Sequence, residues 1–567
     1  MFFPKKLTFK YLQDGYKSGN LTPELVVKEI MKRAAKYADY NVWITNPDVD
    51  SMMKYIEGLP EKASEEYPLW GIPFAIKDNI DLKGIPTTAG CSAYSYDPVE
   101  HATVVKKLIA MGAIPVGKTN LDQFATGLVG TRSPYGEVRN AINPELISGG
   151  SSSGSAVVVA LGMAAFSLGT DTAGSGRVPA ALNKLVGYKP ALGAWSTKGV
   201  VPACASLDCV TVMANSLDDA VTVDTYARGV DEGCCWSKDY GERSIKKPKK
   251  VLLPKEEPEF FGDYQEEYRS AWRKALNRIN KMNLKVEYID YSPFSQAAAI
   301  LYDGPWVAER WKDLGDFVQK NPEQLFPVTE RILRSGSQEK YTAAKVFEAI
   351  HTLQEYKHQV KSILDESVLI MPTIGGTFTR QQVRENPIET NSQLGLYTNH
   401  CNLLDLCAVN VPACVGDQTP FGITIFSLAQ NEGMIISAAE AFEKTETIDL
   451  VVCGLHKQGY PLEYQLLELG AEFKEHAMTA AKYKLYEFNT VPKKPGIIKV
   501  GKGGGSIAVD VYSLPLHCFG AFMKQVPAPL SIGSVEMNDG SVVAGFLGEV
   551  YASETGEDMT AKGIYTI

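Results

Sequence analysis

The stretch Gly169-Thr170-Asp171-Thr172-Ala173-Gly174-Ser175-Gly176-Arg177-Val178-Pro179-Ala180 places a serine inside a glycine-rich turn. It follows the apolar run Phe166-Ser167-Leu168, which is typical of a buried strand. A serine in such a turn is well placed to act as a nucleophile, because successive backbone N–H groups around it can converge on a developing oxyanion. The chain has only seven histidines and none lies near this stretch, so a Ser–His–Asp triad gains little support. The base that activates Ser175 must therefore come from another segment.

A lysine at the end of an apolar strand supplies a candidate base. It lies in Gly71-Ile72-Pro73-Phe74-Ala75-Ile76-Lys77-Asp78-Asn79. If the side chain of Lys77 points inward, desolvation lowers the pKa of the amine, and a neutral amine is a usable general base. On this segment alone, the better interpretation is a strand-end lysine whose amine reaches water.

A third segment, Ser148-Gly149-Gly150-Ser151-Ser152-Ser153-Gly154-Ser155, combines small residues with many hydroxyls. Small residues let backbone and substrate approach closely, and the hydroxyls can donate and accept hydrogen bonds. By itself this pattern also fits a helix cap or an anion-binding loop. Its meaning depends on the other two segments.

Together the three segments resemble the amidase signature family, over roughly residues 20–445. The resemblance implies a Ser–Ser–Lys triad of Lys77, Ser151 and Ser175, in which Ser175 is the nucleophile and Lys77 acts on it through Ser151. It also implies a cis peptide bond between Gly150 and Ser151. The implied oxyanion hole consists of the backbone N–H groups of Thr172, Ala173, Gly174 and Ser175. We expect Asp171 and Arg177 to pair with each other and to pin the loop, without a part in the chemistry.

Departures from the common family pattern narrow the substrate. Ala173-Gly174 stands where two glycines are usual, and Gly149-Gly150-Ser151-Ser152-Ser153-Gly154 stands where GGSSGG is usual. With the segments 459–466 and 527–533, these variants resemble the allophanate-hydrolysing members of the family. The resemblance implies an amidohydrolase in urea degradation, which acts on linear amides and converts the small anion allophanate to ammonia and N-carboxycarbamate.

An anionic amide requires a cation that grips its carboxylate, and the fork of an arginine suits this task. In the segment 301–310, Pro305 is predicted to be the first residue of a helix that carries Arg310. The resemblance assigns Tyr302 and Arg310 to the substrate carboxylate and Gly127 to the lining of the site. Without the resemblance, Arg310 would be interpreted as a surface residue of a helix.

The order of apolar segments predicts an α/β fold with a large mixed β-sheet covered by helices on both faces. Strand-like and helical segments alternate at 69–76, 103–111, 114–116, 153–165 and 166–169. A charged, proline-rich loop is expected at 241–262 and a more helical segment at 263–365. From Ile448 onward, short strands and glycine-rich turns predict a small α+β domain. We therefore expect an amidase signature domain at residues 1–447 and a C-terminal domain at residues 448–567.

In the enzymes that the chain resembles, the C-terminal domain decarboxylates N-carboxycarbamate, and the carbamate then breaks down to carbon dioxide and further ammonia. The candidates for this step are His456, Tyr460, His476 and His517. A purely structural or dimer-forming role for the domain stays open. In fungi the resembled enzyme is fused to a biotin-dependent urea carboxylase, so 567 residues fit one portion of a longer chain. We expect a homodimer and a fused or associated carboxylase.

Composition excludes several other classes of function. The formal net charge of −9 offers no basic field for nucleic acid or anionic membrane, and no apolar run reaches the about 18–20 residues that span a bilayer. The ten cysteines show no metal-binding or redox spacing and predict reduced thiols in a cytoplasmic protein. We expect no metal and no cofactor. The segment 112–119 satisfies the phosphate-loop pattern, but its centre is predicted to be a buried strand.

Two rival functions remain. The first is another small-amide amidase, including the tRNA-dependent amidotransferase subunit of similar core; the negative charge and the C-terminal domain speak against a tRNA partner. The second is a non-catalytic binding protein on an amidase core, and the presence of all three triad residues speaks against it.

Overall fold

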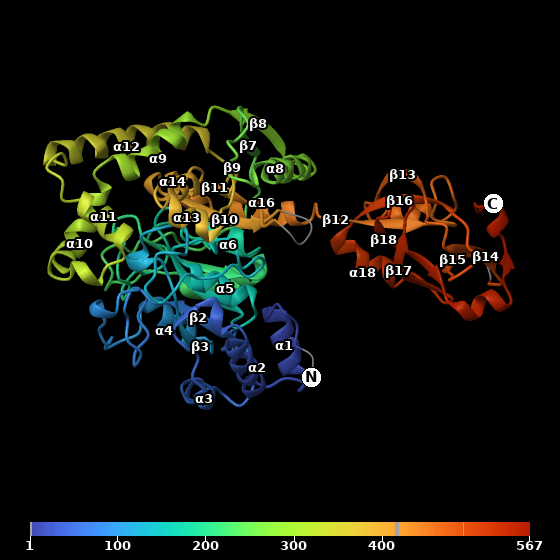
Figure 1. Ribbon diagram of the computed structural model, residues 1–567, viewed down its shortest axis with the longest axis horizontal. Coiled ribbons are helices and arrows are strands. Elements are labelled where there is room, and N and C mark those ends of the chain that lie inside the picture. The colour runs from blue at the N-terminus through green and yellow to red at the C-terminus, as the bar shows by residue number, and fades with distance from the viewer. Residues whose placement is uncertain (1–2, 414–418, 491–492, 567) are drawn as a thin grey trace. The chain divides into compact units, whose positions relative to one another are not determined.

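The computed structural model describes residues 3–413, 419–490 and 493–566. Backbone contacts divide the chain into two units, Met1–Glu440 and Ala441–Ile567, each of which is described by itself (Figure 1). This division falls inside α16 (Glu432–Glu443), a few residues before the predicted boundary at residue 447. The boundary at residue 447 stays a prediction.

An 11-stranded mixed sheet forms the centre of the first unit, in the order β1-β3-β2-β4-β6-β5-β10-β11-β9-β7-β8. Strand β2 is parallel to both of its neighbours, β3 and β4, whereas β4 is antiparallel to β6. The strands are β1 (Trp43–Thr45), β2 (Pro73–Lys77), β3 (Ile114–Thr119), β4 (Phe166–Asp171), β5 (Val186–Lys189), β6 (Cys209–Ala214), β7 (Lys250–Pro254), β8 (Lys285–Ile289), β9 (Ser367–Pro372), β10 (Leu406–Pro412) and β11 (Gly422–Leu428). The C-terminal ends of β2 and β4 therefore lie side by side, and these are the ends where the predicted catalytic segments begin.

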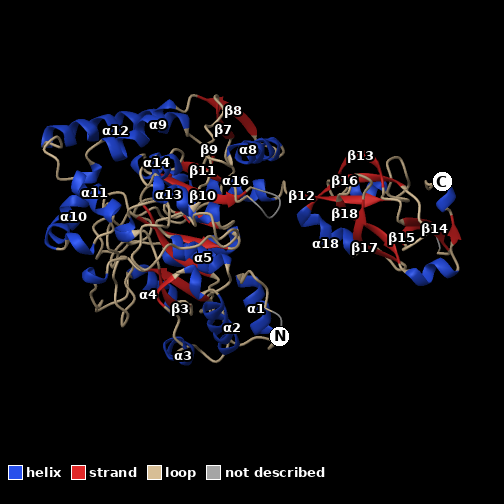
Figure 2. Cartoon of the chain, in the orientation of Figure 1, coloured by secondary structure: helices blue, strands red, loops and turns tan. Residues whose placement is uncertain are grey.

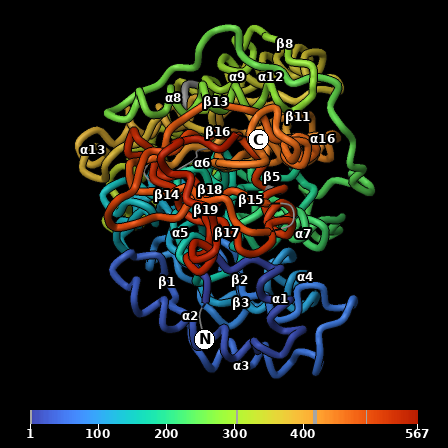
Figure 3. The backbone as a smooth tube through the Cα atoms, turned by 90° about the vertical axis from the view of Figure 1, so that its right-hand side faces the viewer, coloured from blue at the N-terminus to red at the C-terminus, as the bar shows by residue number. Residues whose placement is uncertain are grey.

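Helices lie on both sides of this sheet (Figure 2), as predicted. Helix α5 packs on β2, β4 and β6, and α7 packs on β5 and β6. Figure 3 shows α9 and α12 together at the opposite end of the unit from α2 and α3. The helices that precede α16 are α1 (Phe9–Lys17), α2 (Pro23–Lys36), α3 (Val49–Glu57), α4 (Thr103–Ala110), α5 (Ser153–Ala160), α6 (Arg177–Leu182), α7 (Leu217–Ala227), α8 (Gln265–Asn280), α9 (Ser292–Asp303), α10 (Trp306–Lys320), α11 (Pro327–Ser335), α12 (Ala343–Ile363), α13 (Arg380–Glu385), α14 (Glu389–Leu394) and α15 (His400–Leu403).

Local sequence explains where several elements begin and end. Thr22 caps α2 by accepting a hydrogen bond from the Leu25 N–H, and Pro23 takes the first helical position, where no N–H is needed. Helix α5 is shorter than predicted, because the chain adopts a left-handed turn at Gly162 before it enters β4. Strand β7 lies in the segment 241–262, which the sequence predicted to be a loop. Its short apolar run pairs in parallel with both β8 and β9, and this tertiary pairing overrides the flanking charges and prolines.

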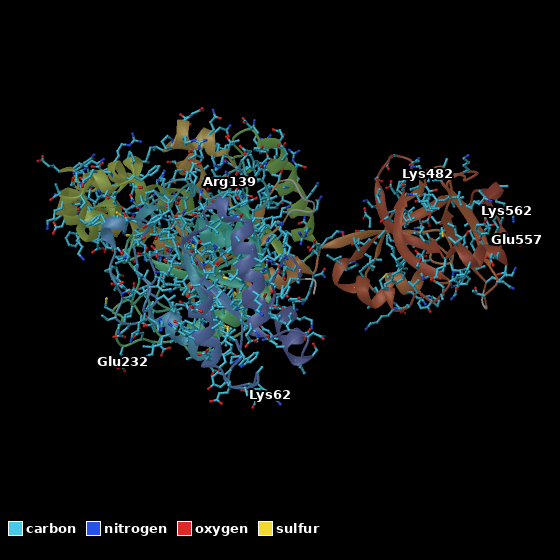
Figure 4. The ribbon with its side chains drawn as sticks, turned by 60° about the horizontal axis from the view of Figure 1, so that its bottom comes forward. Lys62, Arg139, Glu232, Lys482, Glu557 and Lys562 are labelled. Atoms are coloured by element: carbon cyan, nitrogen blue, oxygen red, sulfur yellow. The ribbon has the colours of Figure 1, made fainter. Side chains whose placement is uncertain are left out.

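The second unit is a small domain built on its own sheet, as predicted. The 8-stranded sheet has the order β13-β16-β12-β18-β15-β14-β19, and β17 pairs with β18. Its elements are β12 (Thr447–Val452), α17 (Glu463–Leu467), β13 (Glu472–Met478), β14 (Tyr483–Phe488), β15 (Lys494–Lys499), β16 (Ala508–Pro515), α18 (Phe519–Met523), β17 (Leu530–Glu536), β18 (Val542–Gly548) and β19 (Glu557–Asp558). Buried apolar residues of β12 and β16 form much of its core, whereas charged side chains such as Lys482 point outward (Figure 4).

Within the described ranges, no helix of either unit is long and apolar enough to cross a membrane.

Candidate active site

Lys77 ends strand β2, and its amine lies inside the protein. All five residues of β2 are buried, and the Lys77 side chain is 0% exposed. Its Nζ lies 2.7 Å from Ser151 Oγ and 2.7 Å from Thr170 Oγ1. Burial lowers the pKa of Lys77 to about 7, against the opposing effect of the negative charges of Asp122, Asp208 and Asp171. The lysine therefore does not reach water, and its amine is neutral in a large fraction of molecules at neutral pH.

The second predicted segment carries the cis peptide bond that the family resemblance implied, between Gly150 and Ser151. The Ser151 carbonyl accepts a hydrogen bond from the Asp122 N–H at 3.1 Å, and the neighbouring Ser152 N–H donates to the Ser175 carbonyl at 3.3 Å. A side chain at position 150 would overlap the Asp122 carboxylate, so only glycine fits there. This packing brings the loop that carries Ser151 against the loop that carries Ser175.

Asp171 and Arg177 pair as predicted and hold the nucleophile loop. Arg177 Nε donates to Asp171 Oδ2 at 2.9 Å and Arg177 Nη2 donates to Asp171 Oδ1 at 3.0 Å, and both side chains are fully buried. The Asp171 carboxylate also accepts from the N–H groups of Gly174 (2.8 Å) and Gly176 (3.1 Å). Burial alone would raise the pKa of Asp171, but the Arg177 guanidinium holds it below its ordinary value. The pair stays ionised and fixes the backbone around Ser175.

The predicted oxyanion donors do not all stand free. Gly174 departs from the prediction, because its N–H already donates to Asp171. The N–H groups of Thr172, Ala173 and Ser175 donate no hydrogen bond within the described part of the chain, so they remain available to an oxyanion. Gly174 itself has a φ of +123°, and an added Cβ would overlap Thr398 Oγ1. The turn therefore requires a glycine for its conformation rather than for its N–H.

Ser175 is almost completely buried, and its hydroxyl donates to the Gly127 carbonyl at 3.4 Å. No hydrogen bond joins Ser175 Oγ to Ser151 Oγ among the described residues. The structure thus brings Lys77 and Ser151 into direct contact and brings Ser175 to the adjoining loop. A proton relay from Ser175 to Ser151 requires rotation of the Ser175 side chain away from Gly127.

Arg310 is buried and lies close to the nucleophile loop. It is 5% exposed, so the interpretation as a surface helix residue is wrong. Helix α10, which carries it, begins at Trp306, with Pro305 as the preceding residue. Arg310 Nη1 donates to Thr126 Oγ1 at 3.3 Å, next to Gly127, whose carbonyl accepts from Ser175. Tyr302 belongs to α9, but its side chain lies outside the described residues.

Sequence reasoning missed three buried groups that hold this site. Thr170 shares the Lys77 amine with Ser151. Asp122 accepts hydrogen bonds from the N–H groups of three residues of the following loop, Val129, Gly130 and Arg132. Asp208 accepts from Thr172 Oγ1, and burial raises its pKa to about 6. Thr170 stands in the decisive stretch and could have been found there, whereas no local pattern marks the two carboxylates.

In the second unit, His456 lines a cavity of about 220 Å³. Its Nε2 lies 2.9 Å from Gln465 Oε1, its ring stacks on Phe546 with 5.1 Å between centroids, and burial lowers its pKa. The lining is largely apolar and includes one further ionisable side chain that carries a positive charge, Lys494. The cavity is formed by Val452, Cys453, Gly454, Leu455, His456, Leu462, Gln465, Lys494, Pro495, Phe522, Gln525, Val526, Pro527, Leu530 and Phe546.

The other C-terminal candidates do not line this cavity. His476 Nδ1 lies 2.8 Å from Oδ1 of the buried Asp510, and the His476 side chain is 71% exposed. The Tyr460 hydroxyl donates to the Tyr565 carbonyl at 3.1 Å. The side chain of His517 lies outside the described residues. Over the described ranges, no group of three or more His, Cys, Asp or Glu side chains could hold a metal ion.

Comparison with known proteins matches both parts of the chain. Residues 25–436 match the Amidase family, and residues 448–566 match the family described as allophanate hydrolase C-terminal domain. The chain is 36% identical to the urea amidolyase of Saccharomyces cerevisiae over 97% of its own length and 32% of that protein. It thus spans about a third of the length of the curated urea amidolyases that it matches.

Two further matches frame the substrate question. The solved Kluyveromyces lactis allophanate hydrolase shares 36% identity, with a TM-score of 0.71 and 97% of each chain covered. A glutamyl-tRNA(Gln) amidotransferase from Lactobacillus johnsonii shares, in one of its subunits, 32% identity over 77% of this chain and 95% of that protein. The match to the hydrolase thus includes the second unit.

Proposed function

Since the chain belongs to the amidase family and carries an allophanate hydrolase C-terminal domain, we propose that it hydrolyses allophanate, with Ser175 as nucleophile and Lys77 and Ser151 as its proton relay. The observation that carries the proposal is the buried contact of 2.7 Å between Lys77 Nζ and Ser151 Oγ, on a loop that packs against the Ser175 loop. The similarity to the K. lactis hydrolase, which covers both units, supports allophanate as the substrate.

The first step is acyl transfer to Ser175. Its hydroxyl rotates towards Ser151 and attacks the terminal carboxamide carbon of allophanate, while Ser151 passes the proton to the neutral Lys77 amine. The N–H groups of Thr172, Ala173 and Ser175 stabilise the oxyanion, and a buried hydrogen-bond donor of this kind contributes about 2.7–4 kcal/mol. The proton returns to the leaving nitrogen and ammonia departs. Water then cleaves the acyl-enzyme by the same relay and releases N-carboxycarbamate.

Arg310 supplies the positive charge that an anionic amide requires. Its guanidinium is buried beside Thr126 and Gly127, so a carboxylate bound to it would lie near Ser175. Burial of an unpaired guanidinium is costly, and an anionic ligand removes that cost. Tyr302, on the preceding helix, is proposed as a second ligand of the carboxylate.

The second step is proposed for the C-terminal domain, residues 448–567. There N-carboxycarbamate takes up one proton and loses carbon dioxide, which leaves carbamate to break down to ammonia and further carbon dioxide. Among the four candidates, His456 is the best supported, because it lines the cavity of the unit together with the cationic Lys494. Tyr460, His476 and His517 gain no comparable support.

The assembly around this chain is also a proposal. The chain spans 32% of the S. cerevisiae urea amidolyase, which supports a fused or associated biotin-dependent urea carboxylase. A homodimer and a cytoplasmic location complete the proposal, the latter supported by the nine described cysteines, all of which are free thiols. The net charge of −9 speaks against the tRNA partner of the amidotransferases.

An ammonia-release assay tests the substrate. Purified protein is supplied with allophanate, with biuret, which replaces the carboxylate by a carboxamide, and with short aliphatic amides. We expect kcat/KM for allophanate to exceed that for biuret by about 100-fold, because biuret leaves Arg310 unpaired. Equal rates on allophanate and simple aliphatic amides would show that the substrate assignment is wrong.

A further inference from the structure

We propose that Glu309 is a positioning residue that makes the site selective for an anionic amide, because it ties helix α10 to the loop 203–208 and thereby fixes the neighbouring Arg310 beside the nucleophile. The inference rests on the proposed function, since it takes Arg310 as the ligand of the substrate carboxylate. It concerns how Arg310 is held, which neither the family resemblance nor the nucleophile loop addresses.

Glu309 uses both carboxylate oxygens to hold the loop 203–208. Oε1 accepts from the Ser206 N–H at 2.8 Å, and Oε2 accepts from the Ser206 hydroxyl at 2.6 Å. The thiol of the buried Cys204 also donates to Oε2, at 3.1 Å. These contacts join residues about a hundred positions apart in the sequence, so they fix the first turn of α10 against a separate part of the chain.

The same loop is tied to the nucleophile loop from its other end. The Asp208 carboxylate accepts from the N–H groups of Ala203 (2.8 Å) and Cys204 (3.0 Å) and from Thr172 Oγ1. Thr172 contributes one of the N–H groups that remain available to the oxyanion. The loop 203–208 therefore connects the oxyanion donors to the helix that carries Arg310.

Contacts of Arg310 close the ring on the far side. Its guanidinium donates to Thr126 Oγ1, and the adjacent Gly127 carbonyl accepts from Ser175. Helix α10 is thus held at two points, one on either side of the nucleophile. If the Glu309 contact is lost, Arg310 keeps only its bond to a neutral hydroxyl, and its position relative to Ser175 becomes less defined.

The charge of Glu309 and its tether have opposite effects on an anionic substrate. A negative charge next to Arg310 repels a carboxylate, so its removal alone would tighten binding of allophanate. This charge is partly exposed and already accepts three hydrogen bonds, so solvent and donors screen it. We therefore expect the tether to dominate and its loss to weaken binding.

The test compares kcat and KM for allophanate and biuret in Glu309→Ala, Glu309→Gln and a control, Asp316→Asn, which removes an exposed carboxylate from the same helix. In Glu309→Ala the KM for allophanate should rise about tenfold, while kcat/KM for biuret falls no more than about twofold. Glu309→Gln keeps an acceptor for the Ser206 N–H and should recover most of the loss. Tighter allophanate binding in either variant, or equal losses on both substrates, would overturn the proposal.

A double-mutant cycle shows whether Glu309 acts through Arg310. In an Arg310→Leu background, Glu309→Ala should leave KM for allophanate unchanged, whereas a further tenfold rise would contradict the coupling. The wild-type arm separates this inference from the function on which it rests. If wild type does not prefer allophanate to biuret, the proposed function fails; if it does and Glu309→Ala keeps the wild-type KM, only the role of Glu309 fails.

Discussion

The two units hold their polar groups in different ways. In the first unit, Lys77, Asp171 and Arg177 are fully buried and contact partners from distant parts of the sequence. In the second unit, His476 is 71% exposed beside its carboxylate, and His456 has a single hydrogen-bond partner at the wall of a cavity. Burial shifts a pKa far only where water is excluded, so the first unit can turn a lysine into a base, whereas the second leaves His476 close to bulk solvent.

Loss of the nucleophile should have the largest effect and should separate the two units. Ser175→Ala removes the attacking hydroxyl, so ammonia release from allophanate should fall by about 10⁴-fold or more. Measurement of ammonia in single-turnover reactions checks this. Retention of more than a few per cent of the activity would rule out Ser175 as the nucleophile.

Loss of the base should come next. Lys77→Met keeps an unbranched apolar stem in the buried position but provides no proton acceptor, and we expect kcat to fall by about 10³-fold. Thermal unfolding of the same variant provides the control, because replacement of a buried amine by a thioether should not lower Tm. A variant that keeps its fold and loses less than tenfold in kcat would show that another group activates Ser175.

The second unit should affect only the second half of the reaction. In His456→Ala the first ammonia should appear at the wild-type rate and the second should lag, whereas the exposed His476→Asn should release both normally. A mixture of Ser175→Ala and His456→Ala proteins should restore both phases if the intermediate diffuses between molecules. A normal second phase in His456→Ala would remove this residue from the reaction.

Much of the first unit could be predicted from sequence, because its decisive residues are local. The strand, turn and helix around Ser175 follow each other along the chain, and the ion pair of Asp171 and Arg177 lies within one loop. Strand β7 could not be predicted, because its apolar run is short and gains its stability from pairing with β8 and β9.

The rest of the site depends on contacts across long sequence separations. The inward direction of Lys77 becomes visible only once β2 is seen between β3 and β4. Asp122 and Asp208 lie in unremarkable segments, and the fold alone brings them to the loops that they hold. Gly174 shows the converse: a motif can give the right residue while a side chain, here Asp171, occupies the N–H that the motif seems to offer.

The dependence of kcat/KM on pH tests the neutral lysine most directly. Burial lowers the pKa of Lys77 to about 7, and only the unprotonated amine accepts a proton, so activity must be lost as pH falls through the pKa of the lysine. We expect ammonia release from allophanate to rise about tenfold per pH unit below pH 7 and to level off above about pH 8. A rise with its midpoint above about pH 9, towards the range where an ordinary lysine titrates, or a flat profile between about pH 5.5 and 9 would contradict a buried, uncharged Lys77 as the base.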